Sequence, residues 1–191
     1  MGAFEKYLIA VNILGFLVYF INFLLYRFTE SSNVDALLTV VSLAGGSLGI
    51  FVFVVLFDRK SVKENMMSRV FLLCVLIIQI VIVLYLNGVH GEQLTLAFWD
   101  FFGKYKILVA YLVVINFVSF AAFAIDKINA IEGRSRVRII TLLGLAFIGG
   151  SVGALLGMYI LRHKTRIDYF TVGIPLIMIM QVVVLFFLMN L

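Results

Sequence analysis

The chain alternates between long apolar stretches and short polar ones. Six stretches contain no Asp, Glu, Lys or Arg, and each is between 19 and 23 residues long. An α-helix of about 20 apolar residues crosses the roughly 30 Å hydrocarbon core of a bilayer. The pattern therefore predicts six transmembrane helices, over residues 7–26, 36–57, 70–89, 107–125, 139–161 and 169–191.

The apolar residues are continuous within each stretch and do not alternate with polar ones. A transmembrane β-strand would place polar residues at every second position, so a barrel is excluded. Hydrophobic residues make up 64% of the chain and charged residues 13%, against about 25% charged in soluble domains. We expect an all-α integral protein of the cell membrane.

An internal repeat relates the two halves of the chain. At an offset of 104 residues, positions 7–60 show 12 identities, including Tyr7 with Tyr111, Asn12 with Asn116 and Lys60 with Lys164. We expect a three-helix repeat over 1–86, an interfacial linker rich in aromatic residues over 87–106, and a second three-helix repeat over 107–191.

The number of predicted helices per repeat determines the predicted topology. Three crossings is an odd number, so the second repeat would enter the membrane from the opposite side and the halves would be inverted. The distribution of Lys and Arg favours a cytoplasmic N-terminus by nine residues to six. The second and fifth predicted helices are expected to cross each other at the bilayer midplane.

Glycines spaced four residues apart mark the second and fifth predicted helices. Such spacing lets a neighbouring backbone approach closely, and close packing is one interpretation. The other is a helix break that exposes backbone groups to a substrate, as in transporters. The residues concerned are Gly45, Gly46, Ser47, Gly49, Gly149, Gly150, Ser151, Gly153 and Gly157. Asn12 and Asn116 are their nearest polar neighbours and are expected to make interhelical hydrogen bonds.

The second half resembles the uncharacterised bacterial membrane family called domain of unknown function twelve ninety-four. The resemblance rests on an Asp-Lys pair, a nearby Ala, a basic loop, a Gly-Gly helix and an Arg-His-Lys-Thr run. Here these are Asp126-Lys127, Ala130, Arg136, Gly149-Gly150 and Arg162-His163-Lys164-Thr165. The first copy departs from this pattern, with Asn22-Phe23 and Asp58-Arg59-Lys60 at the matching places. The resemblance implies a fold and a location in the bacterial inner membrane but no activity, and it leaves a homodimer open.

Charged clusters at the helix ends are the candidate anion-binding groups, because Arg and Lys bind phosphate and carboxylate. Anchoring to lipid headgroups is the simpler interpretation. If all six helices cross, Asp126 and His163 lie on opposite faces, so a joint site is excluded unless a helix is re-entrant. Asp126 is then expected to pair with Lys127 or a loop arginine. The candidates are Arg162, His163, Lys164, Arg27, Asp126, Lys127, Arg136, Arg59 and Lys60.

These features favour a small transporter, channel or lipid translocator for an anionic species. A membrane enzyme acting on phospholipid-type headgroups and a non-catalytic lipid-binding or scaffold protein are the alternatives. Anionic lipid headgroups are the expected partners, and nucleic acid is not, since the basic residues form no continuous stripe. No catalytic residue, metal or cofactor is assigned, and Cys74 has no cysteine partner.

Overall fold

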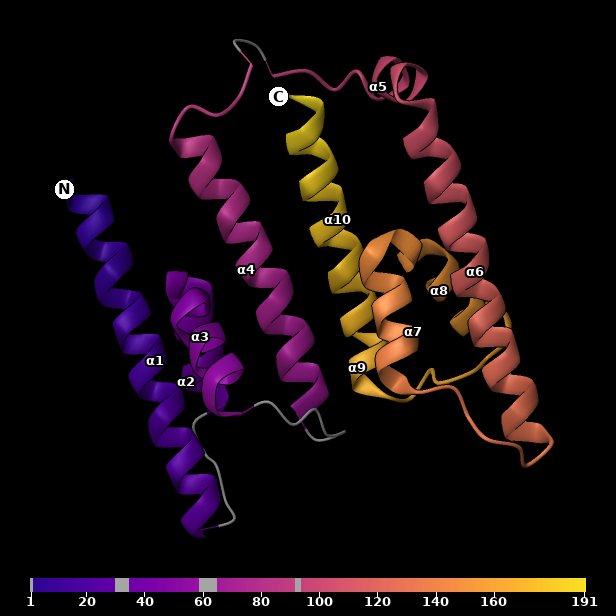
Figure 1. Ribbon diagram of the computed structural model, residues 1–191, viewed down its shortest axis with the longest axis horizontal. Helices are drawn as coiled ribbons and strands as arrows, with labels where there is room; N and C mark the ends of the chain where they lie inside the picture. Colours follow the sequence, from indigo (N-terminus) through magenta and orange to yellow (C-terminus); the bar gives the residue numbers. More distant parts are fainter. Residues whose placement is uncertain (1, 30–34, 59–64, 92–93) are drawn as a thin grey trace. The chain divides into compact units, whose positions relative to one another are not determined.

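The computed structural model describes residues 2–29, 35–58, 65–91 and 94–191. Every regular element in these ranges is a helix (Figure 1). In chain order they are α1 (Ala3–Thr29), α2 (Asp35–Val41), α3 (Ser47–Phe57), α4 (Met66–Leu86), α5 (Phe98–Lys104), α6 (Lys106–Ile131), α7 (Ile139–Leu145), α8 (Ser151–Ile160), α9 (Asp168–Thr171) and α10 (Gly173–Met189).

Among the described residues, six helical segments are long and apolar enough to cross a membrane. They are Ala3–Leu25, Ala36–Phe57, Met66–Leu86, Lys106–Ile131, Ile139–Ile160 and Asp168–Met189. The chain therefore has the make-up of an all-α membrane protein, and the predicted apolar segments agree with the helical ones to within a few residues at most ends. The structure divides the chain into two compact units, Met1–Ile82 and Val83–Leu191.

In the second unit, the segment from Ile139 to Ile160 is two short helices joined by a break at Ala146–Gly150. Gly149 has a φ of 124° at this break, a left-handed conformation that a side chain would strain. At 1.5 Å per residue, α7 is about 10 Å long and α8 about 15 Å. Neither is long enough to cross the roughly 30 Å core of a bilayer by itself.

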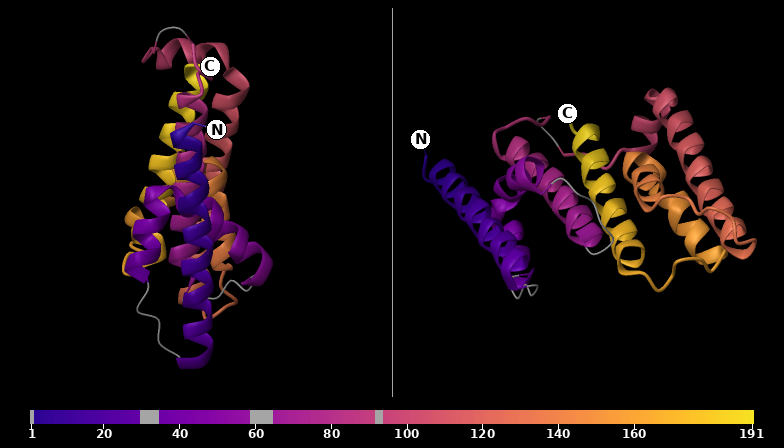
Figure 2. Two further views of the ribbon diagram at one scale, coloured as in Figure 1. Left: turned by 90° about the vertical axis from the view of Figure 1, so that its left-hand side faces the viewer. Right: turned by 60° about the horizontal axis from the view of Figure 1, so that its bottom comes forward.

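The two short helices form a re-entrant pair, meaning that the chain enters and leaves at one end of α6. Asp126, near the end of α6, accepts a hydrogen bond from the Val137 backbone N–H just before α7. The same carboxylate contacts His163, just after α8. Figure 1 shows α7 rising from the loop after α6 and α8 returning beside α6, and the right-hand view of Figure 2 shows this pair alongside α6.

The direction of α8 confirms this path. Asn116 contacts Gly153, and Lys127, eleven residues further along α6, contacts Leu161. Contacts that advance together along both helices mean that α8 runs parallel to α6. A single straight helix leading away from the end of α6 would run antiparallel to it.

The first unit contains the same re-entrant pair, made by α2 and α3. Tyr7 near the start of α1 donates to the Ala44 carbonyl, and Tyr19 further along α1 donates to Asp58 at the end of α3. Helix α3 therefore runs parallel to α1. The break lies at Ser42–Gly46, where Gly45 has a φ of 115°.

The counting argument for inverted halves therefore loses its premise. Each unit has two full-length helices and one pair that turns back, so the number of full-length helices per unit is even.

The expected crossing partner of the glycine-bearing segments also has to be corrected. A Cβ on Gly49 would lie 1.9 Å from the Asn12 carbonyl oxygen of α1, and one on Gly153 would lie 1.9 Å from that of Asn116 in α6. Each glycine face packs on the first long helix of its own unit.

The same hydrogen bonds recur in both units at the repeat offset. Tyr7 to Ala44 matches Tyr111 to Ile148, and the Gly49 N–H bond to Asn12 matches the Gly153 N–H bond to Asn116. The recurrence extends the sequence repeat to the interior of the two units.

Candidate functional site

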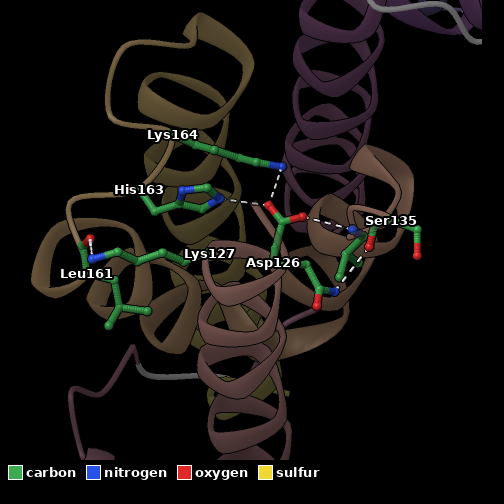
Figure 3. Close-up of polar contacts among 8 residues, drawn as sticks. Asp126, Lys127, Ser135, Leu161, His163 and Lys164 are labelled. Atoms are coloured by element: carbon green, nitrogen blue, oxygen red, sulfur yellow. Dashed lines mark hydrogen bonds and ion pairs between the residues drawn. The ribbon is translucent and has the colours of Figure 1, made fainter. Parts of the chain in front are cut away.

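The Asp126 side chain is fully buried and accepts three hydrogen bonds. Its Oδ1 atom accepts from the Val137 N–H at 2.8 Å. Its Oδ2 atom lies 2.8 Å from His163 Nε2 and 2.7 Å from Lys164 Nζ (Figure 3). A buried carboxylate is costly unless it is paired and hydrogen-bonded. We call Asp126, His163 and Lys164 the clasp.

The chain reaches this geometry through the turn after α8. Lys164 has a φ of 60°, and this left-handed residue sends its side chain back toward α6. Its ammonium group also lies 4.9 Å from the centre of the Phe170 ring. Phe170 is fully buried and packs edge-to-face on Phe123 of α6, with ring centres 5.6 Å apart. The apolar core thus orients the lysine that neutralises Asp126.

Two further side chains of α6 tie down the loops at this end. Lys127 Nζ donates to the Leu161 carbonyl at 2.7 Å, at the end of α8, where helix carbonyls lack a helical partner. Asn129 Nδ2 donates to the Ser135 carbonyl at 3.1 Å in the loop before α7. Together with the clasp, these contacts hold both ends of the re-entrant pair to the last turns of α6 (Figure 3).

The clasp corrects two predictions. The exclusion of a site containing both Asp126 and His163 is wrong, because the chain turns back between them. Asp126 pairs with neither Lys127 nor a loop arginine, since Lys164 and His163 occupy Oδ2. His163 and Lys164 are therefore engaged by a carboxylate and are not free anion-binding groups.

Exposed arginines gather at this same end of the second unit. The loops before α7 and after α8 are held together by Asp126, and both are rich in arginine. Five arginines with exposed side chains lie in these loops, and we call them the arginine end: Arg134, Arg136, Arg138, Arg162 and Arg166. Arg134 also pairs with Glu132 at 3.0 Å.

The first unit has a different arrangement at the matching place. Asn22 stands where the second unit has Asp126. Asp58 instead follows α3, where it accepts from the Tyr19 hydroxyl and pairs with Arg69 at 3.4 Å. Candidate residues Arg59 and Lys60 lie outside the described residues, and the Arg27 side chain is not described either.

The breaks are the other candidate site, and side chains satisfy their backbone groups. In the second unit, Tyr111 donates to the Ile148 carbonyl, and Asn116 bonds both the Gly149 carbonyl and the Gly153 N–H. Gln181 of α10 donates to the carbonyls of Ala146 and Phe147 and accepts from the Ser151 hydroxyl. The predicted interhelical hydrogen bonds of the asparagines are present, and the freed carbonyls at 146–149 are occupied.

Sequence reasoning did not single out the glutamines. Gln79 repeats the role of Gln181, donating to the Ser42 and Leu43 carbonyls and pairing with Ser47. The two glutamines are 102 residues apart, so an ungapped comparison at 104 does not align them. Polar side chains inside membrane segments are rare and costly. The presence of a glutamine in an apolar segment could therefore have indicated a structural role.

Potential metal ligands do not gather in the described part of the chain. No group of three or more His, Cys, Asp or Glu residues has the proximity needed to hold a metal ion there. His90 stacks on Tyr85, with ring centres 4.7 Å apart.

Comparison with known proteins identifies a family for the second half of the chain. The family model described as "Protein of unknown function (DUF1294)" matches residues 116–170, a range that starts at the asparagine of the break and ends at the phenylalanine beneath Lys164. The uncharacterised protein YsdA of Bacillus subtilis (strain 168) is 35% identical over 79 residues, which is 41% of this chain and 89% of that protein. No solved structure matches the chain. The chain belongs to the DUF1294 family.

Proposed function

We propose that the protein is a membrane protein that binds anionic lipid headgroups through its arginine end. The observation that carries the proposal is the buried Asp126, which gathers two arginine-bearing loops at one end of α6. Arginine presents a planar fork of donors to phosphate oxygens. Basic residues at the ends of membrane helices lie at the depth of the headgroups.

The clasp supports this proposal because it separates the cations into two groups. Lys164 and His163 neutralise an internal carboxylate, whereas the arginines are exposed and four of them have no counter-ion among the described residues. A basic residue beside an anionic membrane surface contributes about 1 kcal/mol to attraction. The arginine end therefore favours anionic over zwitterionic lipids.

A lipid titration with native mass spectrometry tests the proposal. The purified protein in detergent is titrated with short-chain phosphatidylglycerol and with phosphatidylcholine of the same chain length. The double variant Arg136→Gln/Arg138→Gln should lose about tenfold in affinity for the anionic lipid, as expected for two cations at about 1 kcal/mol each with partial screening. The variant Lys104→Gln/Lys106→Gln has the same change in charge at the other end of α6 and should lose little. Equal affinity of the wild type for both lipids would contradict the proposal.

Translocation of an anionic species is a second candidate, favoured by the re-entrant pairs. Non-helical backbone at membrane depth occurs where it is buried in protein or lines an aqueous cavity, and broken helices carry substrate sites in transporters. The Ser119 hydroxyl is buried without a hydrogen-bond partner in the described structure, beside the second break. The occupied carbonyls of the break make this candidate weaker than headgroup binding.

Reconstitution tests translocation separately. Proteoliposomes with a fluorescent anionic lipid or entrapped phosphate are monitored for movement across the bilayer, with protein-free vesicles as the baseline. Faster movement that Gly149→Ala abolishes would support translocation, because the φ of 124° at Gly149 forms the break. Rates equal to the baseline for both species would exclude these two substrates.

A further inference from the structure

Helix α8 ends in a turn whose backbone conformation normally requires glycine. The Arg162 N–H bonds the Tyr159 carbonyl at 3.2 Å, and the His163 N–H bonds the Met158 carbonyl at 2.9 Å. This pair of hydrogen bonds defines the Schellman motif, in which the first residue beyond the helix cap is left-handed and usually glycine. Here that residue is Arg162, with a φ of 47°.

Two other helices of the same chain end in a left-handed glycine, and the residue after each glycine makes the longer hydrogen bond of this motif. At the end of α4, Gly88 has a φ of 78° and the Val89 N–H bonds the Leu84 carbonyl. At the end of α6, Gly133 has a φ of 68° and the Arg134 N–H bonds the Asn129 carbonyl. Three helices thus end in a left-handed residue with the same longer hydrogen bond, and within the described residues only α8 has a large side chain at that position.

Neighbouring Lys164 is also left-handed, and its contacts explain why it is not glycine. Its ammonium group neutralises buried Asp126 and lies over Phe170. A residue in a sparsely populated conformation persists where the surrounding structure holds it there. The strain at Lys164 is therefore compensated inside the protein.

Arg162 has no such compensation within the described structure. Its side chain is exposed and makes no hydrogen bond, ion pair or ring contact with a described residue. Glycine would form the same turn with less strain, because it lacks a Cβ. No described residue gains from the arginine side chain, and this points to a ligand as the source of its benefit.

We propose that Arg162 is a specificity-determining residue that binds the phosphate of a lipid headgroup. This inference rests on the proposed function and names its recognition residue. The residues that follow, His163 and Lys164, are fixed by the clasp, so the Arg162 backbone is held in one place before the ligand arrives. It also lies directly beyond the last apolar turn of α8, where a membrane segment meets the headgroup phosphates. The planar guanidinium of arginine binds two phosphate oxygens at once, which the ammonium group of lysine does not.

The test combines melting temperature with lipid affinity in four proteins. Arg162→Gly should raise the melting temperature by about 2–4 °C, since it relieves the strain of a left-handed residue in a chain of this size. It should also weaken binding of short-chain phosphatidylglycerol by about tenfold, the effect of one lost charge-assisted contact. Arg162→Lys keeps the charge and should still weaken binding severalfold. Arg138→Gln removes an equal charge from an ordinary backbone position and should weaken binding less than either.

The possible outcomes distinguish a failure of this inference from a failure of the proposed function. Arg162→Gly with higher stability and unchanged affinity would overturn the inference. Equal losses for Arg162→Gly and Arg138→Gln would also overturn it, while leaving headgroup binding by the arginine end intact. No loss in any variant would remove both. Inorganic phosphate, titrated in parallel, should bind more weakly than the lipid, and equal affinity would overturn the lipid as the source of the phosphate.

Discussion

Asp126 and His163 are 37 residues apart in the chain, yet Oδ2 of one lies 2.8 Å from Nε2 of the other. The intervening residues include an apolar segment of 22 residues that is long enough to cross a membrane. The contact is made because this segment breaks at Gly149 and returns to the end of α6 from which it started. The contacts of the Asp126 carboxylate therefore show that both ends of the segment lie at the same end of α6.

The re-entrant path predicts the accessibility of the two loops of the second unit. With Cys74 replaced by Ala, single cysteines at Ser135→Cys and Arg166→Cys should react with a membrane-impermeant maleimide from the same side of oriented vesicles. A segment that crossed the bilayer would place these positions on opposite sides. Labelling of the two cysteines from different faces would therefore contradict the re-entrant pair.

Loss of the Asp126 charge should destabilise the protein strongly. In Asp126→Asn, the ammonium of Lys164, only 10% exposed, loses its counter-ion, and breaking a buried pair in this way costs about 3–5 kcal/mol. Thermal unfolding in detergent measures the effect. Asp168→Asn is the matched control, because Asp168 is exposed at the start of α9.

A double variant separates the lost pairing from a general defect. Asp126→Asn/Lys164→Met removes both charges, and replacing both members of a buried pair is much less costly than removing one. Most of the lost stability should return. A double variant as unstable as Asp126→Asn would show that the charge of Lys164 is not the cause.

Close helix packing predicts a sharp difference between two glycines of one segment. A Cβ on Gly153 would lie 1.9 Å from the Asn116 carbonyl oxygen, whereas a Cβ on Gly144 meets nothing within 4 Å. Gly153→Ala should destabilise the protein by about 3 kcal/mol or more, because backbone must move. Gly144→Ala should stabilise it by up to about 1 kcal/mol through helix propensity. Equal melting temperatures for the two variants would contradict the packing of α8 on α6.

The fluorescence of the chain's single tryptophan can measure the depth of α5 in the membrane. Trp99 is 90% exposed on this short helix, which also carries Asp100 and Lys104. Aromatic residues with polar neighbours concentrate at the membrane–water interface. In proteoliposomes, lipids brominated near the glycerol should quench Trp99 fluorescence more than lipids brominated near the end of the acyl chains. Stronger quenching by the deep bromines would place α5 inside the hydrocarbon, and Trp99→Phe gives the background.

Much of the candidate site was visible in the sequence as separate motifs. Asp126-Lys127 and Arg162-His163-Lys164 were both singled out as candidate charged groups, and each side chain of the clasp comes from them. Their meeting was not predicted, because counting helices as crossings placed them on opposite faces. Gln79 and Gln181 were missed because they lie in apolar segments and outside the repeat register.

Sequence alone determined the six apolar segments, the repeat and the glycines, because apolar length and residue identity depend on local chemistry. It did not determine whether residues 139–160 cross or turn back, since a spanning helix and a re-entrant pair both have to be apolar in lipid. Tertiary contacts decided that question. Asn116 and Gln181 occupy the carbonyls freed at the break, Gly153 allows α8 to lie against α6, and Asp126 holds both ends of the pair at one place.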